Sequence, residues 1–81
     1  MIDDIGKIVR FHRRQSKLSQ AALARLSGIG KTALFDIEQG KPTVRLQTLA
    51  RVLHALNIKL NWDSPLRTKY ESARKSDSEG A

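Results

Sequence analysis

One short segment of the chain carries four side chains whose types and spacing suit contact with nucleic-acid bases. Lys31 and Thr32 offer hydrogen-bonding groups, and Phe35 and Asp36 follow one helical turn later. On a helix these residues share a face, because positions three and four apart are neighbours. Lysine and threonine hydrogen-bond to base edges or phosphates, and a phenyl ring packs against a thymine methyl group. The spacing predicts base contacts from all four residues; alternatively, Phe35 packs against the preceding helix or a neighbouring subunit.

Other polar side chains flank this segment and suit a phosphate backbone. Ser19 is a good helix N-cap, so Gln20 stands at a helix start, where backbone N–H groups attract anions. Lys17, Lys41 and Arg45 supply positive charge on either side. We predict phosphate contacts from Gln20 and these three cations, and a solvated surface role is the alternative for each cation.

Catalytic and metal-binding patterns are not apparent in the sequence. His12 and His54 have no companion ligands, whereas a zinc site takes three or four. Asp3-Asp4 suits a helix start better than a catalytic carboxylate pair. Gly28-x-Gly30-Lys31-Thr32 lacks the first glycine of a phosphate-binding loop and follows a helix instead of a strand. We predict a protein that is not an enzyme and has no cofactor, metal or small-molecule substrate.

Four segments position these side chains, each with apolar residues every three or four positions, the period of an amphipathic helix. The predicted helices are 2–16, 20–27, 31–39 and 45–56. Gly28, in a left-handed conformation, ends the second, and Gly40 ends the third. The residues expected to face inward are Ile5, Ile8, Val9, His12, Leu23, Leu26, Leu34, Ile37, Leu46, Leu49, Val52, Leu53 and Leu56.

The second and third predicted helices are separated only by Gly28-Ile29-Gly30. Two short helices joined by a glycine-containing turn form a helix-turn-helix unit. The second helix of such a unit enters the major groove and presents its first residues to base edges. Because Lys31 and Thr32 open that helix, the arrangement predicts sequence-specific binding of double-stranded DNA.

The pattern changes after the fourth helix. Ile58, Leu60 and Trp62 alternate with polar residues, the period of a β-strand, over 57–62. A lone strand leaves its backbone groups unpaired, so we predict antiparallel pairing with the same strand of a second copy in a homodimer. The alternative is an apolar segment folded back on the helices. Residues 63–81 are predicted to form a flexible tail, disordered at least beyond Ser76, with a short helix over 66–75 as an option.

Charge and length agree with a DNA-binding domain over residues 1–62. The 81-residue chain has no cysteine and a net charge of +7. Residues 1–62 hold eleven Lys and Arg against four acids, whereas residues 63–81 hold four of each. This distribution indicates a polyanionic partner, with solubility as the alternative. The absence of an apolar span or secretion signal predicts a cytoplasmic protein that is not associated with a membrane, and the predicted DNA partner would place it at the nucleoid.

The motifs over Ile5–Leu56 resemble those of the Xre/Cro helix-turn-helix family, on Ser19-Gln20-x-x-Leu23-Ala24, Gly28-Ile29 and Ile37-Glu38-x-Gly40. Three runs resemble the HipB-type antitoxin branch more narrowly. They are Gly40-Lys41-Pro42-Thr43-Val44-Arg45-Leu46, then Thr48-Leu49-x-x-Val52-Leu53-x-x-Leu56, and then Ile58-Lys59-Leu60-Asn61-Trp62. The resemblance covers about three-quarters of the chain. It departs from the family pattern at Gly30, where a serine or threonine cap is usual.

This resemblance implies an all-α, lambda-repressor-like fold of four to five helices with terminal strands paired between subunits. It also implies a buried ion pair between Arg13 and Glu38, for which two exposed charges are the alternative. HipB-like proteins repress their own operon and bind a HipA-like Ser/Thr kinase toxin, so both roles are expected here. The competing hypotheses are a module that chiefly binds a partner kinase and a stand-alone phage-type repressor.

Overall fold

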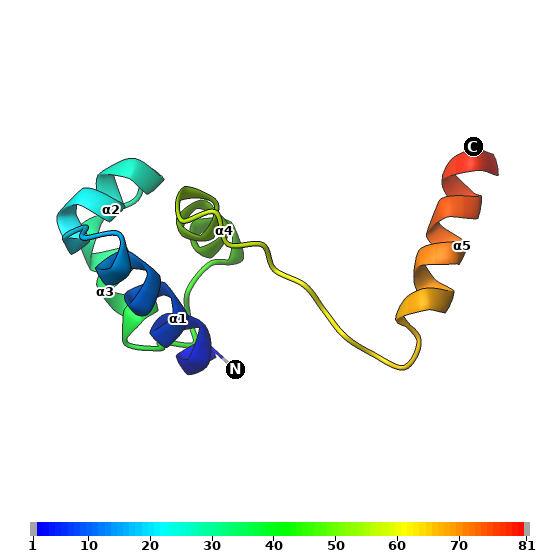
Figure 1. Cartoon of the computed structure of the whole chain (residues 1–81), viewed down its shortest axis with the longest axis horizontal. Helices are drawn as coiled ribbons and strands as arrows, with labels where there is room; N and C mark the ends of the chain where they lie inside the picture. Colours follow the sequence, from blue (N-terminus) through cyan, green and yellow to red (C-terminus); the bar gives the residue numbers. More distant parts are fainter. Residues whose placement is uncertain (1, 81) are drawn as a thin grey trace.

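The computed structural model describes the backbone of residues 2–80 and the side chains of residues 4–76, and it is all-helical, as predicted. The first four helices form one bundle, and an extended segment leads from it to the fifth, which lies apart (Figure 1). The helices are α1 (Ile2–Gln15), α2 (Gln20–Ser27), α3 (Lys31–Glu38), α4 (Leu46–Ala55) and α5 (Arg67–Gly80).

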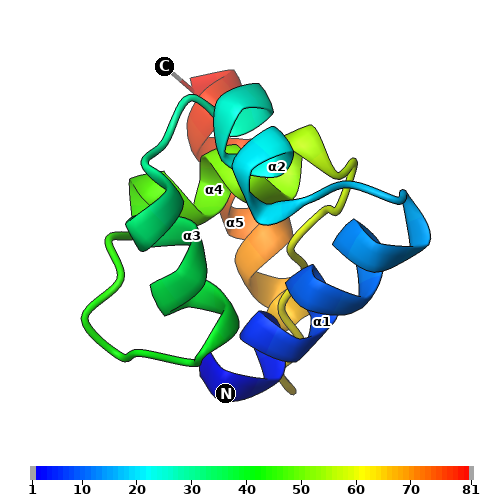
Figure 2. The same cartoon turned by 90° about the vertical axis from the view of Figure 1, so that its left-hand side faces the viewer.

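The core lies where α1 to α4 meet. α1 packs against α3, and α2 packs against both α3 and α4. Seen from the bundle end, α1, α2 and α3 lie in front of α4 (Figure 2). Burial of this apolar surface is the main force that holds these helices together, because isolated helices of 8 to 14 residues are marginal in water. The largest fully buried side chains come from all four helices and are Val9, Leu23, Leu34, Ile37 and Val52.

The turn between α2 and α3 is built by its capping residues. Ser19 is extended, with φ −73° and ψ 163°, and its Oγ accepts a hydrogen bond from the Ala22 N–H at 3.0 Å. Gly28 ends α2 with a left-handed φ of 70°, as the sequence predicts. The next amide, of Ile29, bonds back to the Ala24 carbonyl at 3.0 Å. These bonds satisfy the helix ends and fix the direction in which α3 leaves the turn.

A serine in place of Gly30 is expected to stabilise the fold by about 0.5–1 kcal/mol. Gly30 is the N-cap of α3, with φ −73° and ψ 151°, nearly the conformation of Ser19, and no described atom lies within 4 Å of an added Cβ. The new hydroxyl would accept from the N–H of Ala33, the third residue of α3, as that of Ser19 accepts from the N–H of Ala22. Urea unfolding of Gly30→Ser against the parent chain measures the gain. Ser19→Ala is the matched control, with a loss of about 1 kcal/mol; an unchanged midpoint for Gly30→Ser would contradict the cap geometry.

Three residues predicted to face inward are exposed instead: Ile8 by 45%, Leu26 by 66% and Leu46 by 73%. On α2 the buried stripe runs through Leu23, Ala24 and Ser27, so it is rotated away from Leu26. The Ser27 hydroxyl tolerates this burial because it donates to the Leu23 carbonyl at 2.7 Å. α2 and its neighbours pack closely on small side chains, which apolar spacing alone does not reveal.

The strand predicted over 57–62 is wrong for the single chain, since residues 2–80 contain no β-strand. A strand exists only where its backbone groups find a ladder partner, and one copy of this chain offers none. Ile58 packs partly against the core, as the folded-back alternative requires, whereas Leu60 and Trp62 are exposed by 57% and 46%.

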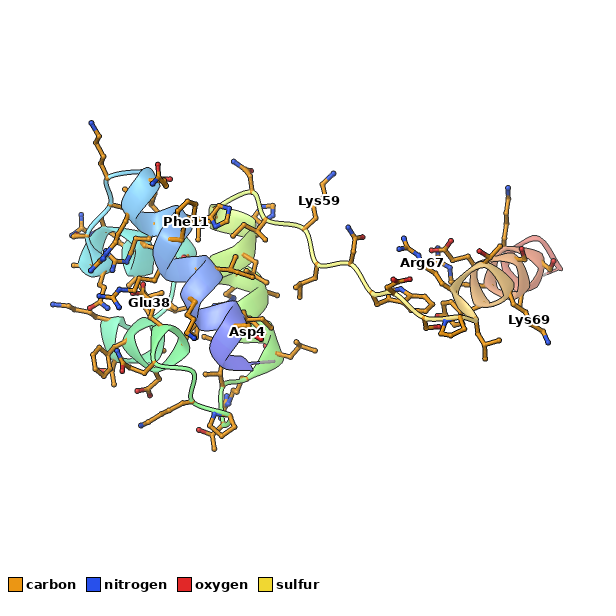
Figure 3. The ribbon with its side chains drawn as sticks, turned by 60° about the horizontal axis from the view of Figure 1, so that its bottom comes forward. Asp4, Phe11, Glu38, Lys59, Arg67 and Lys69 are labelled. Atoms are coloured by element: carbon orange, nitrogen blue, oxygen red, sulfur yellow. The ribbon has the colours of Figure 1, made fainter. Side chains whose placement is uncertain are left out.

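The tail is more regular than predicted. α5 covers all but the first residue of the optional helix 66–75 and continues to Gly80, in a region where disorder was expected beyond Ser76. At its start, Arg67 Nη1 donates to the Trp62 carbonyl at 3.0 Å, and the Trp62 and Tyr70 rings meet edge to face at 5.3 Å. Figure 3 shows Lys59 on the connecting segment and Arg67 and Lys69 on α5, apart from the bundle.

Candidate nucleic-acid interface

The outer side of α3 presents the residues predicted to contact bases. Lys31 and Thr32 are exposed, and Phe35 is 48% exposed, although it is the largest apolar side chain of the helix. The opposite side, with Leu34 and Ile37, is buried. The helix is thus anchored by one face and offers hydrogen-bonding groups and a phenyl ring on the other.

Asp36 lies at the edge of this outer side, next to a cation. Its Oδ1 is 3.4 Å from Lys41 Nζ, and its side chain is 27% exposed. Asp36 and Arg45 also line one hollow between α3 and the start of α4, together with Thr43 and Thr48. The ion pair offsets the negative charge that Asp36 carries near the predicted DNA surface, and it holds Lys41 beside α3. Arg45, the other predicted phosphate contact on this flank, lines the same hollow as Asp36.

Gln20 lies on the other flank. It lines a shallow hollow with Lys31, Thr32 and Phe35. Lys17 is exposed in the turn before α2, where it adopts a left-handed φ of 57°. The predicted contact residues therefore come from the turn before α2, the start of α2, α3 and the loop after it.

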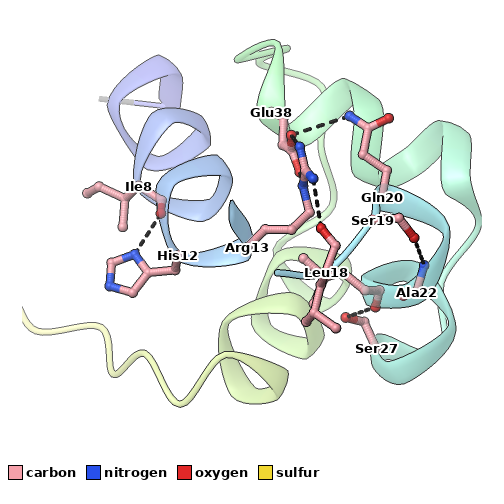
Figure 4. A network of polar contacts seen from close by, with 10 residues as sticks. Ile8, His12, Arg13, Leu18, Ser19, Gln20, Ala22, Ser27 and Glu38 are labelled. Carbon is pink, nitrogen blue, oxygen red and sulfur yellow. Dashed lines mark hydrogen bonds and ion pairs between the residues drawn. The ribbon is translucent and has the colours of Figure 1, made fainter. Parts of the chain in front are cut away.

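Behind this surface, Arg13 of α1 and Glu38 of α3 form a two-bond ion pair. Arg13 Nε donates to Glu38 Oε2 at 2.7 Å, and Nη2 donates to Oε1 at 3.0 Å. The two side chains are only 11% and 1% exposed, respectively. Arg13 Nη1 also donates to the Leu18 carbonyl at 3.0 Å (Figure 4). The hydrogen bonds to Glu38 raise the pKa of Arg13 above its ordinary value, against the opposing effect of burial. The pair ties α1 to α3 and to the turn before α2.

Gln20 extends this network to the surface, a contact that sequence reasoning missed. Its Nε2 donates to Glu38 Oε1 at 3.3 Å (Figure 4). The sequence feature that could have pointed to this contact is Glu38 itself. A carboxylate can accept about four hydrogen bonds, so one that is buried needs donors besides Arg13. Gln20 is thus both a lining residue of the α3 hollow and a partner of the buried pair.

The three residues predicted to form a dimer interface lie in two different environments. Leu60 and Trp62 line an apolar hollow with Ile5, Val44, Leu46 and Leu49, whereas Ile58 lies against the core.

Within the described part of the chain, no three His, Cys, Asp or Glu side chains gather closely enough to ligate a metal ion. His12 instead donates from Nδ1 to the Ile8 carbonyl at 2.7 Å. None of the helices described has the length and apolar character needed to cross a bilayer.

Comparisons with known proteins agree with this geometry. Residues 9–62 match the profile of a family described as helix-turn-helix. A protein of Sinorhizobium fredii (strain NBRC 101917 / NGR234), named "Uncharacterized HTH-type transcriptional regulator y4mF", is 36% identical over 62 residues, which span 76% of this chain and 82% of that protein. The "ImmF control region 10 kDa protein" of Bacillus phage phi105 is 32% identical over 57 residues, 70% of this chain and 63% of that protein. On this evidence the chain belongs to the Xre-type helix-turn-helix family of transcriptional regulators.

Proposed function

We propose that the chain is a repressor that binds double-stranded DNA sequence-specifically, with the start of α3 in the major groove. The observation that carries this proposal is the outward display of Lys31, Thr32 and Phe35 on a helix whose other face is buried. Phosphate contacts from Lys17, Lys41 and Arg45 would hold that helix in register. The net charge of +7 favours approach to a polyanion.

Lys31→Ala is expected to weaken binding to the operator by about 1–3 kcal/mol and to weaken binding to scrambled DNA much less, because a base contact is lost. The probe is duplex DNA from the region upstream of the chain's own gene, measured by fluorescence anisotropy at fixed salt. Lys59→Ala is the matched control, since it removes the same charge from the connecting segment away from α3. An equal loss on both DNAs would show that Lys31 contacts the backbone only.

We further propose that the repressor is a homodimer, with the second copy covering Leu60 and Trp62 as paired antiparallel segments over 57–62. Leu46, 73% exposed, adjoins them in the apolar hollow. Three large apolar side chains beside one hollow are costly in water and become favourable when a like surface covers them. Two recognition helices would then read half-sites about 34 Å apart.

Leu60→Asp is expected to shift the chain from dimer to monomer, because it buries an unpaired carboxylate in the interface. Sedimentation equilibrium measures the mass. Lys59→Asp is the matched control, since neighbouring residues of a strand point to opposite faces. A Lys59→Asp dimer beside a Leu60→Asp monomer supports the proposal. A parent chain that stays monomeric at all concentrations would contradict it.

The proposed operon role is that of an autorepressor and antitoxin in the bacterial cytoplasm, bound to a HipA-like Ser/Thr kinase toxin. Its support is the resemblance over Gly40–Leu56 and Ile58–Trp62. The outer face of α4 and residues 63–81 are the candidate surfaces for the kinase. Co-expression with the neighbouring genes tests this. A co-purified kinase supports it, and its absence points to a stand-alone phage-type repressor. A kinase complex from a chain without operator affinity would instead mark a dedicated kinase-binding module.

A further inference from the structure

The outer side of α1 carries three cations around one exposed phenyl ring. Lys7, Arg10, Phe11 and Arg14 line a hollow there. Their spacing of three, four and seven positions places them in one row along the helix, here called the α1 stripe. Lys7 and Phe11 each stand two positions from the fully buried Val9, so they point to nearly the opposite side of the helix. The α1 stripe therefore faces away from the core.

The positive charge of the α1 stripe is not balanced within the described part of the chain. Among the side chains of residues 4–76, no carboxylate forms an ion pair with Lys7, Arg10 or Arg14. Like charges three or four positions apart repel each other and weaken a helix. The helix dipole favours Arg14, in the last turn of α1, but its effect does not reach Lys7 or Arg10. An acidic partner would relieve this repulsion.

The apolar side chains beside these cations favour a protein over a nucleic acid as that partner. Phe11 is 59% exposed, and Ile8, three positions away, is 45% exposed. Duplex phosphates would neutralise the cations and leave both apolar side chains in water. Single-stranded nucleic acids stack on a succession of rings, whereas here a phenyl ring adjoins an aliphatic side chain. A protein segment with carboxylates and a large apolar side chain matches both features.

The α1 stripe is also separate from the surface proposed to read DNA. That surface is the outer side of α3, which lies on the left in Figure 2, whereas α1 extends to the right. The hollows on the two helices have no lining residue in common. A short segment on the α1 stripe and a duplex on α3 therefore do not compete for the same side chains.

We propose that the α1 stripe binds an acidic amphipathic segment of another protein, with carboxylates at helical spacing around one large apolar side chain. The carboxylates pair with Lys7, Arg10 and Arg14, and the apolar side chain covers Phe11 and Ile8. Arginine suits this role because its guanidinium binds a carboxylate through two parallel hydrogen bonds. The inference goes beyond the proposed function and does not depend on DNA binding.

A random peptide library displayed on phage tests the inference, with the full-length chain immobilised. The enriched peptides are expected to share a consensus of several acidic residues around a large apolar one. A synthetic peptide with that consensus is then the probe, and fluorescence anisotropy measures its affinity for the parent chain and for folded variants, as judged by circular dichroism. A selection without an acidic, apolar consensus would overturn the inference.

The stripe variant replaces the three cations by glutamine, through Lys7→Gln, Arg10→Gln and Arg14→Gln. It is expected to bind the peptide roughly 3- to 100-fold more weakly, the range for three exposed ion pairs. Its matched control removes the same charge from exposed positions away from the bundle, through Lys59→Gln, Lys69→Gln and Lys75→Gln. Equal losses in the two variants would mean that the net charge attracts the peptide, and would overturn the inference.

Phe11→Ala tests the apolar half of the surface. It is expected to weaken peptide binding by about 10-fold, because the apolar side chain of the peptide loses its cover. Leu26→Ala is the matched control, since it removes an apolar side chain that is 66% exposed on α2. An unchanged affinity for Phe11→Ala would refute an amphipathic partner.

Duplex DNA from upstream of the chain's own gene completes the test. The stripe variant and its control are expected to bind this duplex equally. A clearly greater loss for the stripe variant would assign the α1 stripe to DNA phosphates and overturn the inference. A parent chain that binds the peptide but not the duplex would instead defeat the proposed function alone.

Discussion

Glu38→Ala is expected to lower the free energy of unfolding by about 3–5 kcal/mol, the largest effect of any single substitution considered. The variant leaves the guanidinium of Arg13, in a side chain 11% exposed, with its Leu18 carbonyl bond but without its charge partner. An unpaired charge in that buried position destabilises the fold by more than the net stabilisation that the lost hydrogen bonds contributed. Because domains of this size are stable by only about 5–15 kcal/mol, the loss is a large share of the total.

Urea unfolding followed by circular dichroism measures this loss. Glu71→Ala is the matched control, because its ion pair with Arg67, at 3.2 Å, joins side chains that are 40% and 48% exposed. Such an exposed pair contributes about 0–1 kcal/mol. The double variant Arg13→Met with Glu38→Leu is expected to lose less than Glu38→Ala alone, since it strands no charge. Equal losses of unfolding free energy for Glu38→Ala and Glu71→Ala would show that burial does not increase the contribution of the Arg13–Glu38 pair to stability.

Gly6→Ala is expected to destabilise the fold by about 3 kcal/mol, the upper end of the range for overpacking. A Cβ on Gly6 would overlap the carbonyl oxygen of Ile37 and lie 3.1 Å from that of Glu38. These are backbone atoms, so no rotamer change relieves the contact and α1 must move away from α3. The gain of about 1 kcal/mol in helix propensity does not offset this movement.

Thermal unfolding compares Gly6→Ala with Gly30→Ala, where the added methyl group meets no described atom within 4 Å. The melting temperature of Gly6→Ala should fall by many degrees and that of Gly30→Ala should change little. Separation of α1 from α3 also lengthens the Arg13–Glu38 contact, so part of the loss should vanish in the background of the double variant at those two positions. A stability gain for Gly6→Ala would mean that α1 and α3 are not in close contact there.

The helices were predictable from the sequence wherever a capping residue and an apolar period coincide. α2 begins and ends at the predicted residues because Ser19 and Gly28 set both of its ends. The inward faces were less predictable. Small residues such as Gly6 and Ser27 hold positions where helices approach most closely, and a search for large apolar side chains passes over them.

The segment after α4 was the least predictable part. Period-two alternation at Ile58, Leu60 and Trp62 describes a potential strand, but a strand needs a ladder partner that sequence alone does not supply. α5 carries few apolar residues, so composition favoured disorder over helix. Its start depends instead on contacts of Arg67 and Tyr70 with Trp62, which are specific to the folded chain.

Most of the candidate site followed from helical spacing, because the outer face of α3 is fixed by Leu34 and Ile37 on the inner one. The network behind it did not. Arg13 and Glu38 are 25 positions apart, and Gln20 and Glu38 are 18 apart. Only the resemblance to a family predicted the first contact, and nothing in the spacing predicted the second. Tertiary packing decides which polar groups meet across such separations.

Recognition of DNA sequence by the start of α3 can be followed residue by residue in a nuclear magnetic resonance titration of the labelled chain with upstream duplex and with its scrambled counterpart. The amide and side-chain signals of Lys31, Thr32 and Phe35 are expected to shift strongly with the upstream duplex and clearly less with the scrambled one. Shifts confined to α4 or α5, or identical at α3 for both duplexes, would contradict this recognition.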